Sequence, residues 1–208
     1  LLKQNKQDIF ELSECINKWN LIFVIAGRGS LANDRISYLD GDINEIIKKL
    51  GHNFLNSSIN IPDKDILEVL NNPTEFPWKM RLTGNYQDIF FLTSFERIND
   101  YVNIVESKFT EDLGIYIQPI NQGTSYHCEF DLYYEQGDKN SLNTIKEKYW
   151  QISTQLMDKG AFFNRPYGIL AKEVFSRQNE EVVKALKKVK KIFDPNNILN
   201  PGVLCFDD

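Results

Sequence analysis

Apolar residues recur along the second half of the chain at two different spacings. From Tyr126 to Tyr134 they alternate strictly with polar residues, the pattern of a strand with one buried face. A second run recurs every three or four positions and predicts an amphipathic helix from near Asp138 to Gly160. Its apolar positions are Leu142, Ile145, Tyr149, Ile152 and Leu156. This half of the chain is therefore expected to combine strands with amphipathic helices.

Shorter runs predict the neighbouring elements. Ile89 to Leu92 and Ile115 to Ile120 are predicted as strands, and four residues, Asn121 to Thr124, join the second of them to the Tyr126 strand as an antiparallel hairpin. Helical spacing predicts two more helices. Their apolar positions are Ile98, Tyr101, Val102, Val105 and Phe109 in one, and Val182, Val183, Leu186, Val189 and Phe193 in the other. The hairpin and the short links favour an α+β fold, a ferredoxin-like antiparallel sheet covered by helices on one face.

The first fifty residues are predicted as a separate part. Leu21 to Ala26 has the composition of a buried strand, and Arg35 to Tyr38 that of a shorter one. A helix ending at Gly51 is predicted by the spacing of Ile43, Ile46, Ile47 and Leu50. The following segment, Asn53 to Tyr86, is predicted to be rich in loops because three prolines interrupt it, namely Pro62, Pro73 and Pro77.

A glycine-rich turn follows the first predicted strand. Gly27-Arg28-Gly29-Ser30 has part of the composition of a phosphate-binding loop, but it lacks the remaining glycines, and no convincing helix is predicted directly after it. A tight turn into the next strand is the preferred interpretation.

Composition narrows the function classes. The 208 residues are 42% hydrophobic and 25% charged, as in an ordinary globular protein. The net charge of -5 and the lack of a basic stripe with interleaved aromatics argue against nucleic-acid binding. The last helix carries five lysines, Lys184, Lys187, Lys188, Lys190 and Lys191, which are interpreted as a solvated face.

The cysteines and the apolar runs of the sequence indicate the cellular compartment of the protein. Cys15, Cys128 and Cys205 are odd in number and widely separated, so reduced thiols are expected rather than a disulfide framework. No apolar run is long enough to span a bilayer, and the amino terminus lacks the features of a signal peptide. We therefore expect a cytoplasmic protein. Because the chain begins without methionine, we also expect a processed or trimmed product.

The polar face of the Tyr126 strand is the first candidate site. His127, Glu129, Asp131 and Tyr133 share this face, and neighbouring members stand about 7 Å apart along the strand. That spacing predicts that they are not simple hydrogen-bonded pairs. A solvent-facing polar surface is the alternative interpretation. Since the chain has two histidines and no paired cysteine spacing, no zinc site is predicted.

The loop from Gly160 to Gly168 is the second candidate site. It places Arg165 and Tyr167 among aromatics, between glycines and beside Pro166. An arginine keeps its charge at any working pH and can donate two parallel hydrogen bonds to a carboxylate or a phenolate. The alternative is an arginine paired with a surface carboxylate and a tyrosine packed in the core.

The chain closes with a helix stop, Phe193-Asp194-Pro195-Asn196-Asn197-Ile198-Leu199-Asn200-Pro201-Gly202. The lysines of the last turn suit the negative end of the helix dipole, and the proline after Asp194 disfavours helical geometry. By itself this segment is a backbone feature that any globular protein could have.

Four segments together resemble the substrate (cap) domain and C-terminal arm of the vanillyl-alcohol oxidase and 4-cresol dehydrogenase family of flavin-linked oxidases. They are Gly114 to Pro119, Tyr126 to Phe130, Gly160 to Gly168, and Lys190 to Gly202. The last is specific to the wider superfamily, and the others suggest its phenol-oxidising branch. The resemblance implies that residues 1–208 are a cap domain with its C-terminal arm, and that the N-terminal FAD-binding domain is absent from this chain.

The resemblance also implies roles for residues. In the family an arginine in the loop after the long cap helix stabilises the substrate's phenolate, and Arg165 matches that place. The tyrosine that usually precedes it is Asn164 here, so Tyr167 or a residue outside the chain would serve instead. Glu129 completes the implied catalytic residues. The implied cofactor is FAD, which some members of the family attach covalently to a histidine or tyrosine of the cap.

His127 lies in a comparable strand region and is the first candidate for FAD attachment. Tyr126 and Tyr116 are the alternatives, noncovalent FAD stays open, and Asn200 of the closing segment is a further cofactor-binding candidate. The implied activity is oxidation of para-substituted phenols or aromatic alcohols by hydride transfer to flavin. The implied partners are an FAD-binding domain or subunit, a small aromatic substrate, an electron-acceptor protein as a further candidate, and further copies of the complete enzyme in a homo-oligomer.

Two other functions stay open. One is a D-lactate or glycolate type of 2-hydroxy acid dehydrogenase, in which Arg165 would bind a carboxylate and His127 would sit near a metal. The other is a noncatalytic ferredoxin-like module that mediates assembly.

Overall fold

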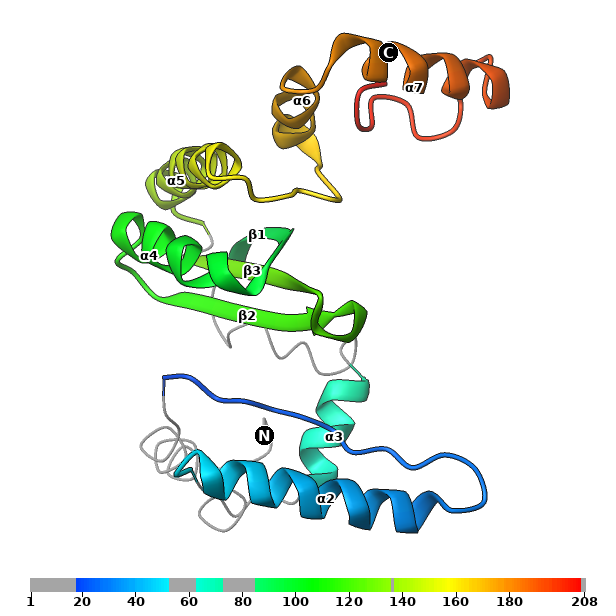
Figure 1. Cartoon of the computed structure of the whole chain (residues 1–208). Helices are drawn as coiled ribbons and strands as arrows, with labels where there is room; N and C mark the ends of the chain where they lie inside the picture. Colours follow the sequence, from blue (N-terminus) through cyan, green and yellow to red (C-terminus); the bar gives the residue numbers. More distant parts are fainter. Residues whose placement is uncertain (1–17, 53–62, 73–84, 136, 207–208) are drawn as a thin grey trace. The chain divides into compact units, whose positions relative to one another are not determined.

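A three-stranded antiparallel sheet forms the centre of the second half of the chain (Figure 1). Its strands are β1 (Asn85–Thr93), β2 (Leu113–Ile120) and β3 (Ser125–Tyr134), in the order β1-β3-β2. The three strands predicted for this half of the chain are therefore confirmed. The hairpin is confirmed as well, and its turn uses positive φ angles at Asn121, Gln122 and Gly123.

The structure is a computed structural model that describes residues 18–52, 63–72, 85–135 and 137–206. The chain divides into two compact units, Leu1–Trp78 and Lys79–Asp208, and the sheet belongs to the second. The boundary falls within the segment that the sequence predicted to be rich in loops. Its three prolines lie outside the described residues.

Two helices cover one face of the sheet (Figure 1). They are α4 (Ile98–Lys108) and α5 (Lys139–Asp158), and the side chain of Asp138 caps α5 by accepting hydrogen bonds from two backbone N–H groups, those of Asn140 and Ser141. The core lies between this face and the helices. Its most buried members are Ile89, Phe91, Tyr101, Val105, Cys128, Phe130, Leu132, Ile152 and Leu156. The apolar face that the alternation predicted for β3 is thus the core face.

The chain returns to β1 after α5, but the pairing is brief. Leu92 and Phe162 exchange two backbone hydrogen bonds, of 2.8 and 3.1 Å, as an isolated antiparallel bridge beside β1. The order β1-α4-β2-β3-α5 with this bridge is a ferredoxin-like arrangement in which the fourth strand is reduced to one residue pair. The predicted α+β, ferredoxin-like fold is confirmed.

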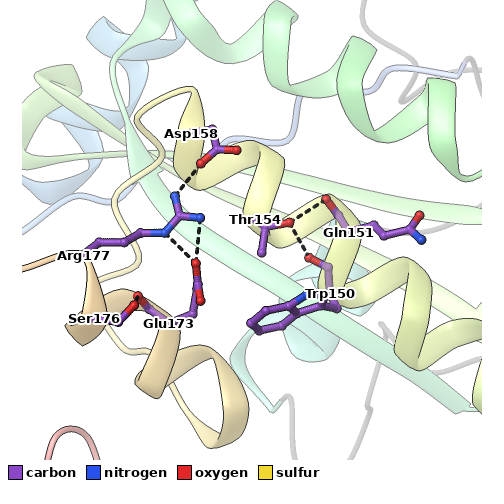
Figure 2. A network of polar contacts seen from close by, with 7 residues as sticks. All are labelled: Trp150, Gln151, Thr154, Asp158, Glu173, Ser176 and Arg177. Carbon is purple, nitrogen blue, oxygen red and sulfur yellow. Dashed lines mark hydrogen bonds and ion pairs between the residues drawn. The ribbon is translucent and has the colours of Figure 1, made fainter.

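A short helix and a surface network follow this bridge. Helix α6 (Gly168–Ser176), which the sequence did not predict, is followed directly by Arg177. The Arg177 guanidinium contacts Asp158 of α5 at 2.6 Å and Glu173 of α6 at 2.7 Å (Figure 2). Because Arg177 bridges the two helices, it holds the end of α5 and the body of α6 together, on either side of the Arg165 loop.

The last predicted helix is confirmed as α7 (Glu180–Phe193), and the side chain of Asn179 caps it by accepting a hydrogen bond from the backbone N–H of Glu181. After it, Asp194 folds the closing segment back on the helix. Its carboxylate accepts hydrogen bonds from the backbone N–H groups of Ile198 (2.9 Å) and Leu199 (2.8 Å) and from Lys190 Nζ. The predicted helix stop is confirmed, and a buried ion pair organises it.

Two predictions for the first unit are wrong. Leu21 to Ala26 is not a strand but lies in irregular structure, and Leu21 is 85% exposed. Arg35 to Tyr38 belongs to helix α2 (Ala32–Lys49). The β-branched and aromatic run suggested a strand, yet the structure gives it no strand partner within the described residues. Apolar composition does not distinguish a strand from another segment when pairing is absent.

The turn before α2 also differs from its prediction. Gly27 lies so close to Ala32 that a Cβ atom would stand 2.2 Å from the Ala32 carbonyl oxygen. The turn therefore folds onto the first turn of a helix, not into a strand. The predicted end of α2 is confirmed, because Gly51 follows the helix with a φ of 73°. A second helix, α3 (Asp63–Asn71), lies in the segment predicted to be rich in loops.

Candidate functional site

The Arg165 loop lies at the free edge of β1. After the Leu92–Phe162 bridge the chain turns away from the strand, because Phe163 enters the core beside Phe91, with ring centroids 5.6 Å apart. A shallow, open depression forms beside the bridge, where a fourth strand would have continued. It is lined by Asp88, Phe90, Tyr149, Phe163, Arg165, Pro166, Tyr167 and Leu170. Asp88 and Phe90 lie on the face of β1 away from the core, whereas Tyr149 and Phe163 belong to the core side.

Both ends of this loop are fixed. At its start, the carbonyl oxygen of Lys159 accepts hydrogen bonds from Arg97 (2.6 Å) and Tyr101 (3.1 Å). Gly160 then turns the chain with a φ of 87°. At the other end, Arg177 holds α6 against the end of α5 (Figure 2). The loop is therefore a short connection between two anchored points.

Arg165 lies over an aromatic ring. Its guanidinium carbon is 5.0 Å from the centroid of the Phe90 ring, within the range of a cation–π contact. Among the described residues Arg165 has neither an ion-pair partner nor a hydrogen-bond acceptor. The alternative interpretation, an arginine paired with a surface carboxylate, is thus not what this part of the chain shows. Among the described residues no carboxylate neutralises this charge.

Tyr167 is tied to β1 by its hydroxyl. This group donates a hydrogen bond to Asp88 Oδ1 at 2.8 Å and accepts one from Gln87 Nε2 at 2.8 Å. The ring also stacks on Phe90, with centroids 6.1 Å apart. Burial of the hydroxyl, followed by its hydrogen bonds to Tyr149 and Asp88, raises the pKa of Tyr167 well above its usual range. The residue is 43% exposed, so this burial concerns the hydroxyl end and not the whole ring.

Tyr149 is the second phenol at the depression. Its side chain points from α5 into the core boundary and is 8% exposed. Burial raises the pKa of Tyr149 to about 12, while the neighbouring Tyr167 hydroxyl lowers it and the Asp88 charge raises it slightly. The Tyr167 proton can serve only one acceptor, and the Asp88 oxygen has the hydrogen-bond geometry. The Tyr149 hydroxyl is a near neighbour of the Tyr167 hydroxyl, and among the described residues it has no other hydrogen-bond partner.

His127 and Glu129 form a pair on the other face of the sheet, which corrects the prediction that they stand too far apart. His127 Nε2 is 3.2 Å from Glu129 Oε2, and their side chains are 13% and 8% exposed. The Cα spacing of about 7 Å was a sound figure, but both side chains are long enough to lean together along the strand. The buried carboxylate orients the imidazole through one of its two nitrogens.

An aromatic row crosses this outer face. The Phe90 ring of β1 is 6.0 Å from the His127 ring of β3, which is 6.1 Å from the Tyr116 ring of β2. Register explains the row, because Phe90, Glu129 and Tyr116 are direct cross-strand partners. Tyr167 extends it at the β1 edge. The structure therefore links Tyr167, His127, Glu129 and Tyr116 through Phe90, which the sequence did not single out.

Two other candidate residues lie apart from this row. Tyr126 packs on the core face of β3, against Phe95 at 5.6 Å, and so faces away from His127. Asn200 is exposed in the closing segment and has a φ of 50°. The structure does not bring either residue to the Arg165 depression.

The sequence analysis missed four residues of the site: Gln87, Asp88, Phe90 and Tyr149. Tyr149 was counted only as part of the α5 apolar stripe. Asp88 and Phe90 stand two positions apart on one face of β1, and this polar and aromatic pair is the signal that could have pointed to the strand. No pattern in one sequence, however, shows which loop will lie against that edge.

Residues of the described part of the chain do not assemble three histidine, cysteine or carboxylate side chains that could hold a metal ion. The same part of the chain has no helix with both the length and the apolar character needed to cross a membrane.

Known proteins are similar to parts of this chain. Residues 167–204 match the model of the family "FAD linked oxidases, C-terminal domain". A solved structure of 4-ethylphenol oxidase from Gulosibacter chungangensis, in an isoeugenol complex, is 18% identical over 73% of this chain, with a TM-score of 0.49. The chain spans 32% of the length of that protein. No curated protein matches significantly. In the segment that carries α6, α7 and the Asp194 turn, the chain is therefore similar to the C-terminal domain of FAD linked oxidases, as the sequence predicted.

Proposed function

We propose that this chain is the cap part of an FAD-dependent oxidoreductase, and that it holds the oxygen of a para-substituted phenol or aromatic alcohol at Arg165. The observation that carries the proposal is the Arg165 guanidinium, which lies over Phe90 beside two tyrosine hydroxyls and has no carboxylate partner among the described residues. A cation in this position would lower the pKa of a bound phenol and so raise its phenolate fraction. The match of residues 167–204 to FAD linked oxidases supports the flavin context.

The aromatic character of the site favours a ring-bearing ligand over a small hydroxy acid. Phe90 and Phe163 line the depression, and Tyr167 is stacked on Phe90. A 2-hydroxy acid would also be bound by Arg165, but it would leave these rings without an apolar partner. Because the depression is shallow, we propose that the FAD-binding domain or subunit covers it and completes the pocket.

The outer face of the sheet has side chains that suit a planar cofactor. Phe90, His127 and Tyr116 present rings along one row, and the Glu129 carboxylate holds one nitrogen of the imidazole. We propose that His127 is the residue toward the flavin, with Tyr116 beside it, and that Glu129 acts by orienting His127. Bound FAD would supply the hydride acceptor. Asn200 is retained as a cofactor-side residue of the closing arm, and a cytoplasmic location stays a prediction.

The proposal is tested first on the chain itself. A chromophoric phenol, 4-nitrophenol, is titrated with the chain and its phenolate band is followed, with benzoate and lactate as competing anions. We expect saturable binding and a lowered pKa of the bound phenol. Arg165→Ala should abolish both effects, whereas Lys172→Ala, an exposed cation on α6 outside the depression, should change neither. Binding of lactate in preference to phenols would overturn the phenol assignment.

The activity is tested with the FAD-binding domain present. We expect yellow protein whose flavin is bleached by para-alkylphenols under anaerobic conditions. Arg165→Ala should lower kcat/KM by about 100- to 1000-fold, as for loss of one donor to a developing oxyanion. A chain that neither retains flavin nor supports bleaching with any such domain would instead be an assembly module.

A further inference from the structure

We propose that Phe90 is a positioning residue for Arg165, and that its ring holds the guanidinium in place while leaving the N–H groups to the ligand oxygen. This inference rests on the proposed function, because it explains how the cation of the same depression is oriented. No pattern in the sequence pointed to Phe90. Its role follows from the contacts that its ring makes in the structure.

The Arg165 side chain needs a support besides its own backbone. Pro166 is buried and restricts the backbone of the residue before it, so the loop fixes where this side chain begins. The side chain itself is long and belongs to an exposed residue. Ordering it costs conformational entropy, and a ligand has to meet that cost unless the protein orders the side chain beforehand. A contact that fixes the guanidinium before binding would therefore raise the affinity.

The Phe90 ring is placed to make that contact. Its centroid is 5.0 Å from the Arg165 guanidinium carbon, and the residue lies on the outer face of β1, opposite Glu129 of β3. The face of an aromatic ring is electron-rich and attracts a cation. A carboxylate would attract the cation more strongly, but it would also occupy N–H donors and neutralise the charge. The ring does neither, so the guanidinium keeps its donors and its charge for an anionic oxygen.

The acidic residue of the depression is bound by a different partner. Asp88 Oδ1 accepts the hydrogen bond of the Tyr167 hydroxyl at 2.8 Å, and among the described residues no ion pair joins Asp88 to Arg165. The Tyr167 ring also stacks on Phe90, with centroids 6.1 Å apart and an interplanar angle of 21°. Tyr167 thus engages the carboxylate and packs against the ring on which the arginine lies.

Fluorination of Phe90 tests the contact in the full chain. Phenylalanines with increasing fluorine substitution are introduced at position 90, which withdraws electrons from the ring face and changes its size little. A cation is then held less well, whereas stacking on an electron-rich phenol ring is not weakened. We expect the affinity for 4-nitrophenol to fall stepwise along the series, with a bound phenol whose pKa is less depressed. A constant or rising affinity would overturn the inference.

Natural substitutions give a second measurement. Phe90→Leu should weaken 4-nitrophenol binding about 2- to 5-fold, as for loss of an exposed cation–π contact, whereas Phe90→Tyr keeps the ring and should bind nearly as the wild type does. Phe95→Leu is the matched control. Phe95 also packs against a tyrosine, Tyr126, but it lies outside the depression and among the described residues has no cation over its ring. Equal losses in Phe90→Leu and Phe90→Tyr would contradict the inference.

A third measurement needs no ligand. Protons above a ring face are shifted upfield, so the Arg165 side-chain protons next to the guanidinium should show such a shift in the NMR spectrum, and Phe90→Leu should remove it. An unshifted signal in the wild type would overturn the inference. If the wild type binds 4-nitrophenol and Arg165→Ala does not, the proposed function survives a failure of the Phe90 predictions. A shifted Arg165 signal without any binding by the wild type would instead reject the proposed function.

Discussion

Cys128 lies at the centre of the sheet, 1% exposed, and burial raises the pKa of its thiol to about 12. It shares β3 with the His127–Glu129 pair, yet it faces the core while they face the other side. Neighbours in sequence are thus placed in opposite environments by the period of the strand. The thiol is a packing group, and the polar pair one position away lies on the opposite face.

Cys128 should make the stability of the chain fall at alkaline pH. The thiol pKa is raised in the folded state, so the unfolded chain ionises first. The protonated thiol contributes fully to the free energy of unfolding below about pH 9. This contribution is lost as the pH rises toward 12, and the free energy of unfolding then falls by up to about 1.4 kcal/mol per pH unit. Urea unfolding at a series of pH values measures this slope. Cys128→Ala should be less stable throughout but should show a flatter slope, and an equal slope would contradict the assignment.

At the scale of elements, the ends of helices decide where the site residues stand. The end of α5 is held by Arg97 and Tyr101 through the Lys159 carbonyl, and the end of α7 is held by Asp194. Each end has a stop signal in the sequence, Gly160 after α5 and Asp194 before Pro195 after α7. The end of α5 fixes the start of the Arg165 loop.

Gly160→Ala should destabilise the second unit. The residue has a φ of 87°, and an added Cβ would stand 2.6 Å from Arg97 Nη1. We expect a loss of about 1–2 kcal/mol, together with displacement of the Arg97 contact. Gly41→Ala is the matched control, because Gly41 lies inside α2 with nothing near its Cβ, and it should gain about 0.5–1 kcal/mol. Equal effects of the two changes, by thermal unfolding, would contradict this account.

Asp194→Asn should loosen the closing arm. The Lys190 hydrogen bond, followed by the backbone N–H groups of Ile198 and Leu199, holds the pKa of Asp194 below its usual value. A depressed carboxyl pKa stabilises the fold above the unfolded value of about 4, and this contribution is lost as the pH falls below it. We expect faster amide hydrogen exchange at Ile198 and Leu199 in the variant, and the same change in the wild type at acid pH. Slow exchange in both would show that the carboxylate does not organise the turn.

At the scale of the whole molecule, the chain leaves apolar surface uncovered. On α7, Ile192 is 74% and Phe193 79% exposed, and no residue of that helix is buried. The segment that matches FAD linked oxidases includes this helix. We expect the FAD-binding domain to pack on it, since an amphipathic helix gains little stability until its apolar face is covered.

Ile192→Ser and Phe193→Ser should therefore separate folding from association. Neither side chain is buried in the chain, so each substitution should change the free energy of unfolding by less than about 0.5 kcal/mol. Association with the FAD-binding domain should weaken by about tenfold or more. Lys188→Ser, on the same helix, is the control and should affect neither quantity strongly. If the variants lose stability but associate as tightly as the wild type, the apolar face of α7 packs within the chain and does not bind the FAD-binding domain.

The sequence by itself determined most elements of the second unit, with helix α6 the exception. Alternation in β3, the α5 and α7 stripes, and the stop signals at Gly160 and Asp194 were sufficient, because each depends on a local period or a local φ angle. In the first unit the same reasoning failed at Leu21 to Ala26, where apolar residues have no strand to pair with among the described residues.

Only the tertiary structure decided the site. The His127–Glu129 contact depends on side-chain reach, and the depression depends on β1 and the Arg165 loop meeting 75 or more positions apart in the chain, as the Tyr167 contacts with Gln87 and Asp88 show. The hydrogen bonds that tie the Tyr167 hydroxyl to Gln87 and Asp88 are likewise invisible in the sequence. Hydrogen-bond partners are set by packing between distant segments, and a local pattern carries no information about which segments will meet.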